Sequence, residues 1–388
     1  MNIILFDTEA RKKLFPLTLT RAIADVRMGI LTIKERWEKI TRANVFILSA
    51  AYLQPLYETI PPGEYIFVDA RLIPDAALIP GITGLETNNC LNDHEGLIAG
   101  KATIDSLPSI EQIPSLFQNS SAISPVRRLT FPQEIFQLNE EMIRFDYNLV
   151  TQKRIPCDTN DTVHVTKPSQ IFIEEGAKID FSILNASTGP IYIGKNATIM
   201  EGCVIRGPLA LCEGAVLKMG TKIYGATTIG PYCTGGGEIK NSVMMGYSNK
   251  GHDGYLGDSV IGEWCNMGAG TSNSNVKNNG SEVKLWNYDS KNYITAGNKC
   301  GMIMGDYSRT AINSAINTGT VIGVCCNIFG YGLTAKFIPD FSWGAKGTEK
   351  YEFEKAVTDA GNWKKMKNKT VGETERQVLK HIFDHHND

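Results

Sequence analysis

Residues 191–230 read IYIGKNATIMEGCVIRGPLALCEGAVLKMGTKIYGATTIG, and an aliphatic side chain recurs in this stretch at every sixth position. Small residues lie four positions after most of them, with Gly and Asn between. An α-helix would repeat its apolar positions every three or four residues, and a strand every two. A period of six predicts a left-handed parallel β-helix of hexapeptide repeats, whose coils bury one continuous apolar column. The aliphatic positions are Ile193, Ile199, Ile205, Leu211, Leu217, Ile223 and Ile229, and the register returns at Ile261, Met267, Ile316, Ile322 and Ile328.

Length and composition narrow the class of protein. A chain of 388 residues has room for two or more domains. Its net charge of −2 gives no basic excess, so we expect no nucleic-acid and no membrane partner. The apolar start is too short for a signal peptide, and no run of about 18 apolar residues exists to span a bilayer. The nine cysteines contain no C-x-x-C pair, which argues against zinc and disulfides and for a reduced, cytoplasmic protein.

Residues 1–155 have the pattern of an α/β domain. Short apolar runs of strand length alternate with a helical segment whose start, at Thr32 and Glu35, has the spacing of a capping box. This order predicts a mainly parallel sheet. A second helix is expected over Gln133–Phe145, and Lys153–Lys167 reads as the join to the next domain. The strands are predicted at Asn2–Phe6, Val45–Leu48 and Tyr65–Val68, and the first helix at Ile33–Ile40.

Open α/β sheets bind ligands beyond the carboxyl ends of their strands. After the first strand, Leu14–Thr18 reads L-F-P-L-T and resembles the entry motif of the sugar nucleotidyltransferases. That resemblance implies a nucleoside triphosphate such as UTP, and Mg²⁺ on the strand-end carboxylate of Asp69. The Gly-x-Gly of the family is absent, and the charged residues in its place are equally consistent with a solvated surface. The cations predicted to contact the triphosphate are Arg11, Lys13, Arg21 and Arg27.

The hexapeptide repeat breaks at Gly246–Asp258, and we expect this segment to leave the β-helix as a loop that carries function. It contains His252. From Gly251 to Asp258 the sequence reads G-H-D-G-Y-L-G-D, and Gly268–Thr271 reads G-A-G-T. These motifs closely resemble the acetyltransferase domain of the bifunctional enzymes of UDP-N-acetylglucosamine synthesis, over residues 170–330. The resemblance implies acetyl transfer from acetyl-CoA to glucosamine 1-phosphate and uridylyl transfer from UTP.

Carried over residue by residue, the resemblance makes His252 the general base that takes a proton from the sugar amine. An ammonium group cannot attack a thioester, and imidazole is the side chain suited to accept that proton near neutral pH. The backbone amides of Gly268–Gly270 are candidate donors to the oxyanion. Lys222 replaces an arginine of the family, which keeps the charge and loses the bidentate fork. The predicted substrate contacts are Lys222, Lys240 and Tyr255 to the sugar phosphate, and Asn266 and Asn275 to the sugar and the acetyl group.

Each of these residues also has a plainer interpretation. His252 can be a loop histidine bonded to backbone, Lys240 a surface lysine at the edge of a coil, and Asn266 a turn asparagine in a left-handed corner. On charge alone, the later coils offer Arg309, Asn313 and Lys336 to the phosphates of CoA.

Two further regions lie beyond the repeat. The polar stretch Asn273–Tyr293 predicts a second excursion from the β-helix. The chain from Thr348 has a helical pattern whose aromatic residues must bury against the β-helix or a neighbouring chain. Related β-helix acyltransferases are trimers with shared active sites, so the resemblance implies a homotrimer. The predicted domains are residues 1–155, 156–345 and 346–388.

Three functions stay open at this point. The chain is a bifunctional acetyl- and uridylyltransferase, an acetyltransferase with a degenerate N-terminal domain, or a nucleotidyltransferase whose β-helix only assembles and regulates. The missing glycine-rich loop favours the second, and His252 argues against the third. A binding protein without catalysis is a remote fourth.

Overall fold

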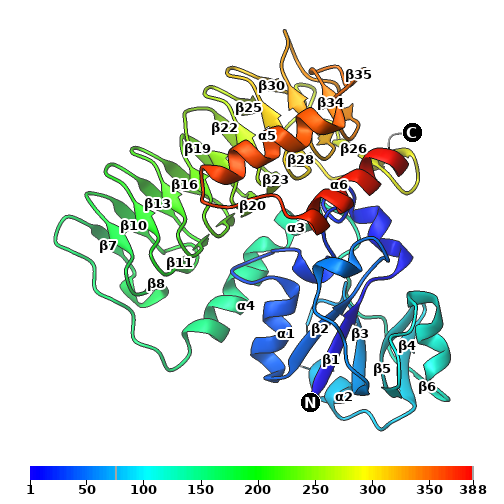
Figure 1. Ribbon diagram of the computed structural model, residues 1–388. Helices are drawn as coiled ribbons and strands as arrows, with labels where there is room; N and C mark the ends of the chain where they lie inside the picture. The colour runs from blue at the N-terminus through cyan, green and yellow to red at the C-terminus, as the bar shows by residue number, and fades with distance from the viewer. Residues whose placement is uncertain (75–76, 387–388) are drawn as a thin grey trace.

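The computed structural model describes residues 1–74 and 77–386. An α/β domain lies against the side of a long β-helix, and two C-terminal helices run back over both (Figure 1). The left-handed β-helix predicted from the period of six is confirmed, because its strands form three parallel sheets that each take one strand from every regular coil.

The three sheets make the three faces of the β-helix. Regular coils advance by eighteen residues, three hexapeptides, so that Leu209 pairs with Thr227 and Thr198 with Val216. The first face holds β7 (His164–Thr166), β10 (Ile183–Asn185), β13 (Val204–Arg206), β16 (Lys222–Tyr224), β19 (Glu238–Lys240) and β22 (Tyr255–Gly257). The second holds β8 (Ile171–Ile173), β11 (Ile191–Ile193), β14 (Leu209–Leu211), β17 (Thr227–Ile229), β20 (Val243–Gly246), β23 (Val260–Glu263), β28 (Met302–Met304), β31 (Thr320–Ile322) and β33 (Phe337–Ile338). The third holds β9 (Lys178–Ile179), β12 (Thr198–Ile199), β15 (Val216–Leu217), β18 (Thr234–Gly235), β21 (Asn249–Lys250), β24 (Asn266–Met267), β29 (Arg309–Thr310), β32 (Asn327–Ile328), β34 (Ser342–Trp343) and, antiparallel at the end, β35 (Glu349–Lys350).

The core of the β-helix is the predicted aliphatic column. Every aliphatic position of the repeat is buried, and the small residues that alternate with them, such as Ala197 and Ala215, are fully buried as well. Cys203 and Cys233 belong to the same column. All nine cysteines are free thiols.

The prediction that Gly246–Asp258 leaves the β-helix is wrong. β21 and β22 pair in register with the preceding coil, Asn249 with Thr234 and Tyr255 with Glu238. The hexapeptide pattern fails there because successive coils are shortened: Asn249 follows Thr234 by fifteen residues and Tyr255 follows Glu238 by seventeen, instead of eighteen. His252 therefore occupies a corner of the β-helix and not a loose loop.

The second predicted excursion is confirmed. After β25 (Ser272–Asn273), which pairs with β30 (Ala315–Ile316), the chain leaves the coils and forms the hairpin of β26 (Lys284–Asn287) and β27 (Asn292–Thr295). Val283, Leu285 and Ala296 pack into the core of the N-terminal domain, so the excursion fastens that domain to the β-helix.

The N-terminal sheet has the order β2-β1-β3-β5-β4-β6. Its three predicted strands and capped first helix are confirmed, and Thr32 Oγ1 accepts from the amide of Glu35 at 3.1 Å. The predicted second helix is split in two. The bounds are β1 (Asn2–Phe6), β2 (Asn44–Leu48), β3 (Gly63–Asp69), β4 (Asn89–Asp93), β5 (Gly96–Ile104), β6 (Asn119–Ala122), α1 (Ile33–Thr41), α2 (Leu78–Thr83), α3 (Glu134–Gln137) and α4 (Asn139–Thr151), with 3₁₀ turns η1 (Glu9–Leu14), η2 (Ile23–Asp25), η3 (Gln54–Leu56), η4 (Ile110–Leu116) and η5 (Pro168–Gln170).

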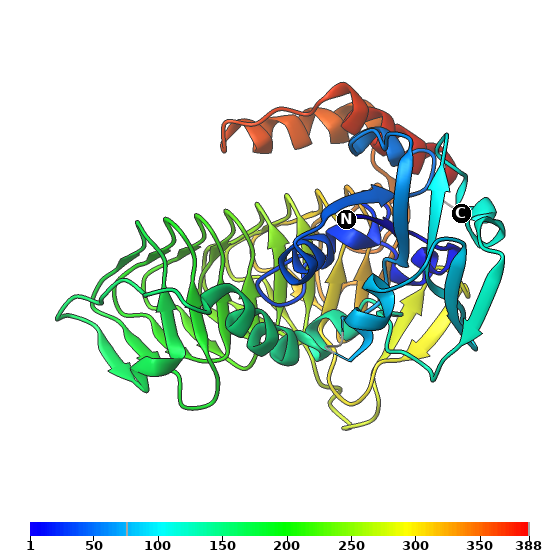
Figure 2. The same cartoon turned by 90° about the horizontal axis from the view of Figure 1, so that it is seen from below.

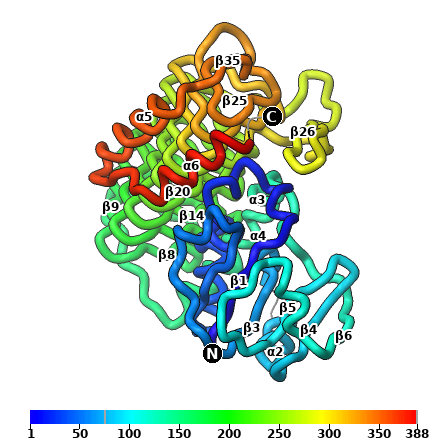
Figure 3. The backbone as a smooth tube through the Cα atoms, turned by 45° about the vertical axis from the view of Figure 1, so that its right-hand side comes forward, coloured from blue at the N-terminus to red at the C-terminus, as the bar shows by residue number. Residues whose placement is uncertain are grey.

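Each face of the β-helix has a different environment. The N-terminal domain covers the later strands of the second face, from β20 to β31. Val243 and Met245 of β20 point outward into the core of that domain, while Met244 points into the β-helix. The helices α5 (Phe353–Lys365) and α6 (Glu373–His385) pack on the corner between the second and third faces, and α6 continues over the N-terminal domain (Figures 2 and 3). The first face keeps exposed side chains along β13 and β16. Across the described ranges, no helix has the length and apolarity that a bilayer span requires.

Candidate active sites

The open first face gathers three of the predicted acetyltransferase residues. The register places Lys222 beside Glu238 and Glu238 beside Tyr255, with Tyr224 beside Lys240 in the parallel column. The ammonium of Lys240 lies 5.9 Å from the centroid of the Tyr224 ring. Within the described chain, Lys222 and Lys240 form no ion pair with a carboxylate. These two cations therefore face solvent with their charge available to an anionic ligand.

His252 lies at the corner between third-face β21 and first-face β22, with its side chain exposed. The corner is held from inside by Lys250, which is only 2% exposed. Its ammonium donates to the carbonyls of Gly236 and His252, both at 2.9 Å. Burial lowers the pKa of Lys250 to about 8, and the charge of Asp253 opposes that fall. Sequence reasoning missed this lysine, because Lys250 occupies an inward position where the repeat predicts an apolar residue.

The backbone at this corner leaves no space for a side chain at Gly254. Gly254 has φ +125°, and a Cβ there would lie 2.1 Å from the carbonyl oxygen of Thr271. The amide of Gly268 donates to the Thr310 carbonyl, and that of Gly270 to the Asp253 carbonyl. The prediction that these two amides serve the oxyanion is therefore wrong, since carbonyls of the next and the preceding coil already accept from them.

Asn275 joins the first face from the start of the excursion. Its amide nitrogen donates to the hydroxyl of Tyr255 at 3.1 Å and to the carboxylate of Asp258. Burial, with Asp258 nearby, raises the pKa of Tyr255 to about 12, so the phenol stays protonated at neutral pH. The side-chain amide of Asn273 accepts from the backbone N–H of Gly257 at 2.9 Å and donates to the Gly257 carbonyl at 3.1 Å. It thereby takes the place of a further strand of the sheet.

Asn266 and the predicted CoA contacts lie on the third face and at later corners. Asn266 pairs with Arg309 in the ladder of β24 and β29. Arg309 is buried beneath α5, with its guanidinium 5.9 Å from the Trp363 ring, and its Nε and Nη2 atoms have no hydrogen-bond partner. Asn313 is an exposed corner residue with φ 55°, and Lys336 precedes β33. Asn266 and Arg309 thus lie on the third face, Asn313 lies at the corner between β29 and β30, and Lys336 directly precedes a strand of the second face.

The four cations predicted for the triphosphate are not brought together. Arg11 is buried and pairs with Asp7 at 3.4 Å. Arg21 pairs with Asp306 of the β-helix, and Arg27 with Glu35 at 3.2 Å. Lys13 lies at the end of η1, where its carbonyl accepts from Asn287 at 3.2 Å. Three of the four are therefore committed to carboxylates of this chain.

Asp69 does end β3 as predicted, yet its surroundings do not fit Mg²⁺. Its carboxylate accepts from Arg71 at 2.7 Å and from Arg128 at 3.1 Å, and Arg128 also binds Asp93 at 2.6 Å. Mg²⁺ requires several oxygen ligands, whereas the carboxylate of Asp69 already accepts from two guanidinium groups. No group of three or more His, Cys, Asp or Glu side chains in the described residues is arranged to hold a metal. We derive no step through a metal here.

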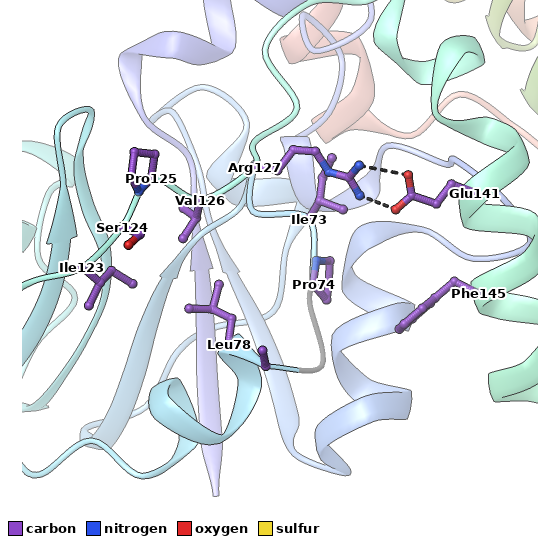
Figure 4. Close-up of a pocket in the computed structure, with 11 residues that line it drawn as sticks. Ile73, Pro74, Leu78, Ile123, Ser124, Pro125, Val126, Arg127, Glu141 and Phe145 are labelled. Atoms are coloured by element: carbon purple, nitrogen blue, oxygen red, sulfur yellow. Dashed lines mark hydrogen bonds and ion pairs between the residues drawn. The ribbon is translucent and has the colours of Figure 1, made fainter.

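Two cavities open on the N-terminal domain. One of about 860 Å³ lies between the Ile123–Arg127 segment, α2 and α4, with mainly apolar walls and the Arg127–Glu141 ion pair at its rim (Figure 4). None of the predicted site residues lines it. A second, of about 630 Å³, lies at the carboxyl ends of β1 and β2 and includes Arg11 in its wall.

Comparisons with known proteins agree with this architecture. Residues 3–155 match the model of a family described as sugar nucleotidyl transferase. A bifunctional sugar-1-phosphate nucleotidylyltransferase/acetyltransferase of Sulfurisphaera tokodaii is 40% identical over 92 residues, 24% of this chain and 23% of the relative. The bifunctional protein GlmU of Methanocaldococcus jannaschii is 32% identical over 120 residues, 31% of this chain and 27% of the relative. GlmU of Synechococcus elongatus is 25% identical over 232 residues, 54% of this chain and 47% of the relative.

The chain thus spans at most about half the length of these curated relatives. The matches nonetheless fall on a chain that has both an α/β domain and a hexapeptide β-helix, in that order. The chain is thus similar to the bifunctional GlmU proteins, and its residues 3–155, which match the sugar nucleotidyl transferase family model, precede a parallel β-helix.

Proposed function

We propose that the chain is a transferase of sugar-nucleotide biosynthesis whose β-helix acetylates the amine of glucosamine 1-phosphate with acetyl-CoA. The observation that carries this proposal is the placing of His252 at the corner that opens onto the first face, where Lys222, Lys240 and Tyr255 stand in adjacent columns. Parallel strands lie about 4.8 Å apart, so residues in register on neighbouring strands, such as Glu238 and Tyr255, lie within reach of one small ligand.

The chemistry asks for a base and an anion site. The amine nitrogen forms a bond to the acetyl carbonyl carbon, the C–S bond of the thioester breaks, and the proton lost by the amine passes through His252 to the CoA thiolate. The ammonium groups of Lys222 and Lys240 hold the phosphate by charge. Asn275, fixed by Tyr255 and Asp258, is the proposed polar contact to the sugar.

The third face serves the second substrate. Asn266 is the proposed contact to the acetyl group, and Arg309, Asn313 and Lys336 are the proposed contacts to CoA. Support comes from the two guanidinium nitrogens of Arg309 that lack an acceptor, since a buried cationic donor without a partner suits a phosphate oxygen.

For the N-terminal domain we propose nucleotidyl transfer from UTP to the acetylated sugar 1-phosphate. The family match over residues 3–155 supports the class of reaction, and the cavity at the carboxyl ends of β1 and β2 supports the place. We propose in addition that the chain acts as a homotrimer in the cytoplasm. Its exposed first face offers a surface that a neighbouring copy completes, and its free thiols suit a reducing compartment.

Kinetics of single variants test the acetyl half. Lys222→Ala and Lys240→Ala are each expected to raise KM for the sugar phosphate by about tenfold and to leave KM for acetyl-CoA unchanged. Lys178→Ala, an exposed lysine of β9 on another face, is the matched control. A rise in KM for acetyl-CoA instead would place the cofactor on the first face and overturn the assignment. Pyrophosphate release from UTP without any thiol release would favour the alternative of a nucleotidyltransferase with a structural β-helix.

A further inference from the structure

The cavity at the carboxyl ends of β1 and β2 is built from both ends of the chain. Its volume of about 630 Å³ lies in the range of small-molecule sites. The loop and 3₁₀ turn after β1 supply one wall, the segment after β2 a second, and residues 107–111 a third. The remaining wall is α6, which contributes His381 and His386. A domain defined by residues 3–155 thus has a cavity that residues near position 385 complete.

The contacts across this wall are aromatic. The ring of His381 stacks on that of Tyr52, with centroids 4.1 Å apart and planes at 12°. The ring of His386 meets Phe15 edge to face at 5.5 Å. The guanidinium of Arg11 lies 5.2 Å from the centroid of Phe15 and 5.5 Å from that of Tyr52. Four rings therefore line the cavity, together with two cations, Arg11 and Lys12.

The two imidazoles act here as uncharged rings. Burial, together with the neighbouring basic groups His381, Arg11, His385 and Lys12, lowers the pKa of His386 to about 4. Burial and His385 lower the pKa of His381 as well, and the carboxylate of Asp384 opposes this. A neutral imidazole offers a flat ring face and one hydrogen-bond donor. Such a wall suits a planar, polar heterocycle. Of the two cations of η1 that line the cavity, Arg11 pairs with buried Asp7, whereas Lys12 pairs with the exposed Glu9, a partner that a phosphate of the ligand would replace.

We infer that α6 is part of the nucleotide site: the base of a nucleoside triphosphate binds in this cavity against the wall of Tyr52, His381 and His386, and its phosphates lie toward η1. This inference rests on the proposed nucleotidyl transfer and deepens it. It also accounts for the tail histidines, whose aromatic contacts with the N-terminal domain a mere terminal extension would not need.

The test is calorimetric titration of the full chain with UTP, in parallel with the other three ribonucleoside triphosphates, and with inorganic tripolyphosphate as a ligand without a base. His381→Ala is expected to weaken binding of the preferred nucleotide by about tenfold and that of tripolyphosphate by less than twofold, because the lost ring contacts only the base. His164→Ala on β7 repeats the chemical change far from the cavity. Gln377→Ala changes an exposed residue of the same helix. Both controls are expected to bind like the unmodified chain.

Each other result has a defined meaning. Nucleotide binding that His381→Ala leaves unchanged, or strengthens, overturns the inference and leaves nucleotidyl transfer standing. An equal loss for UTP and tripolyphosphate shows general disruption of the domain and also overturns it. If the unmodified chain binds no nucleotide, the nucleotidyl half of the proposed function fails together with the inference. Unfolding curves and acetyl transfer, measured on every variant, separate these outcomes from misfolding.

Discussion

Lys250 provides a test of how the β-helix holds the corner that carries His252, the proposed general base. The substitution Lys250→Met keeps the length of the side chain and removes the ammonium that donates to the carbonyls of Gly236 and His252. Because that ammonium is the link between the interior and the turn that carries His252, the exposed imidazole loses its fixed position. A shift of about 1 Å at a reacting group lowers a rate by up to roughly a hundredfold. We expect kcat/KM for acetyl transfer to fall by about ten- to a hundredfold.

Stability should change much less than activity. A pKa of about 8 in place of 10.5 means that burial disfavours charged Lys250 by roughly 3 kcal/mol, which the substitution removes. Against this, two carbonyls lose their donor, at about 1–3 kcal/mol each. The two effects nearly offset each other, so the free energy of unfolding at pH 7 should stay within about 2 kcal/mol of its original value.

The assay is acetyl transfer at several pH values, beside urea unfolding, with Lys178→Met as the matched control on the same sheet. In the unmodified protein Lys250 loses its proton above about pH 8, so activity should decline there, and in the variant this decline should be absent. Unchanged kcat/KM at pH 7 would refute the positioning role. A loss of activity that parallels a loss of several kcal/mol in stability would refute the offset.

Four more substitutions test the fold and its electrostatics. Arg21→Ala removes the ion-pair partner of buried Asp306, and Asp306→Ala leaves buried Arg21 with Glu263 at 3.5 Å as its remaining carboxylate, so each should lower the free energy of unfolding by about 3–5 kcal/mol, and urea unfolding of the double variant should show strong coupling instead of additivity. Burial raises the pKa of Asp340 to about 7 from 3.8. The folded state therefore binds the extra proton, stability falls as pH rises from about 4 to 7, and Asp340→Asn should stabilise the protein by about 2–4 kcal/mol at pH 8, with a difference that shrinks toward pH 4 in thermal unfolding. Gly254→Ala places a methyl group 2.1 Å from the Thr271 carbonyl oxygen, so acetyl transfer should drop at least tenfold; full activity would show that the corner tolerates rearrangement.

The β-helix was predictable because its signal is local and repeated. Each inward aliphatic reports the same environment, so a few coils identify the fold. The same method failed at Gly246–Asp258, where a fifteen-residue coil breaks the spacing and places the polar Lys250 inside. The motif around His252 was nevertheless recognisable, because it depends on the order of residue types and not on the period.

The strands and side-chain partners of the N-terminal domain were harder to predict from the sequence. β6 is wholly exposed and reads N-S-S-A, which has neither the alternation nor the apolar residues of a strand. The pairing of Arg21 with Asp306 spans 285 residues, so no local pattern announces it. Arg11 and Arg21 follow β1 and therefore resembled part of a triphosphate site, but both form buried ion pairs within this chain. The position of a residue after a strand shows where its side chain begins and does not identify the group that it pairs with.

The central claim is that His252 is the base of an acetyltransferase, and CoA-thiol release by the full chain tests it most directly. The rate is measured from acetyl-CoA with and without glucosamine 1-phosphate, for the unmodified chain, His252→Ala and the matched control His164→Ala. We expect release that depends on the sugar phosphate, survives in His164→Ala and falls at least a hundredfold in His252→Ala. Sugar-dependent release that His252→Ala retains, or no release by the intact chain, would contradict the account.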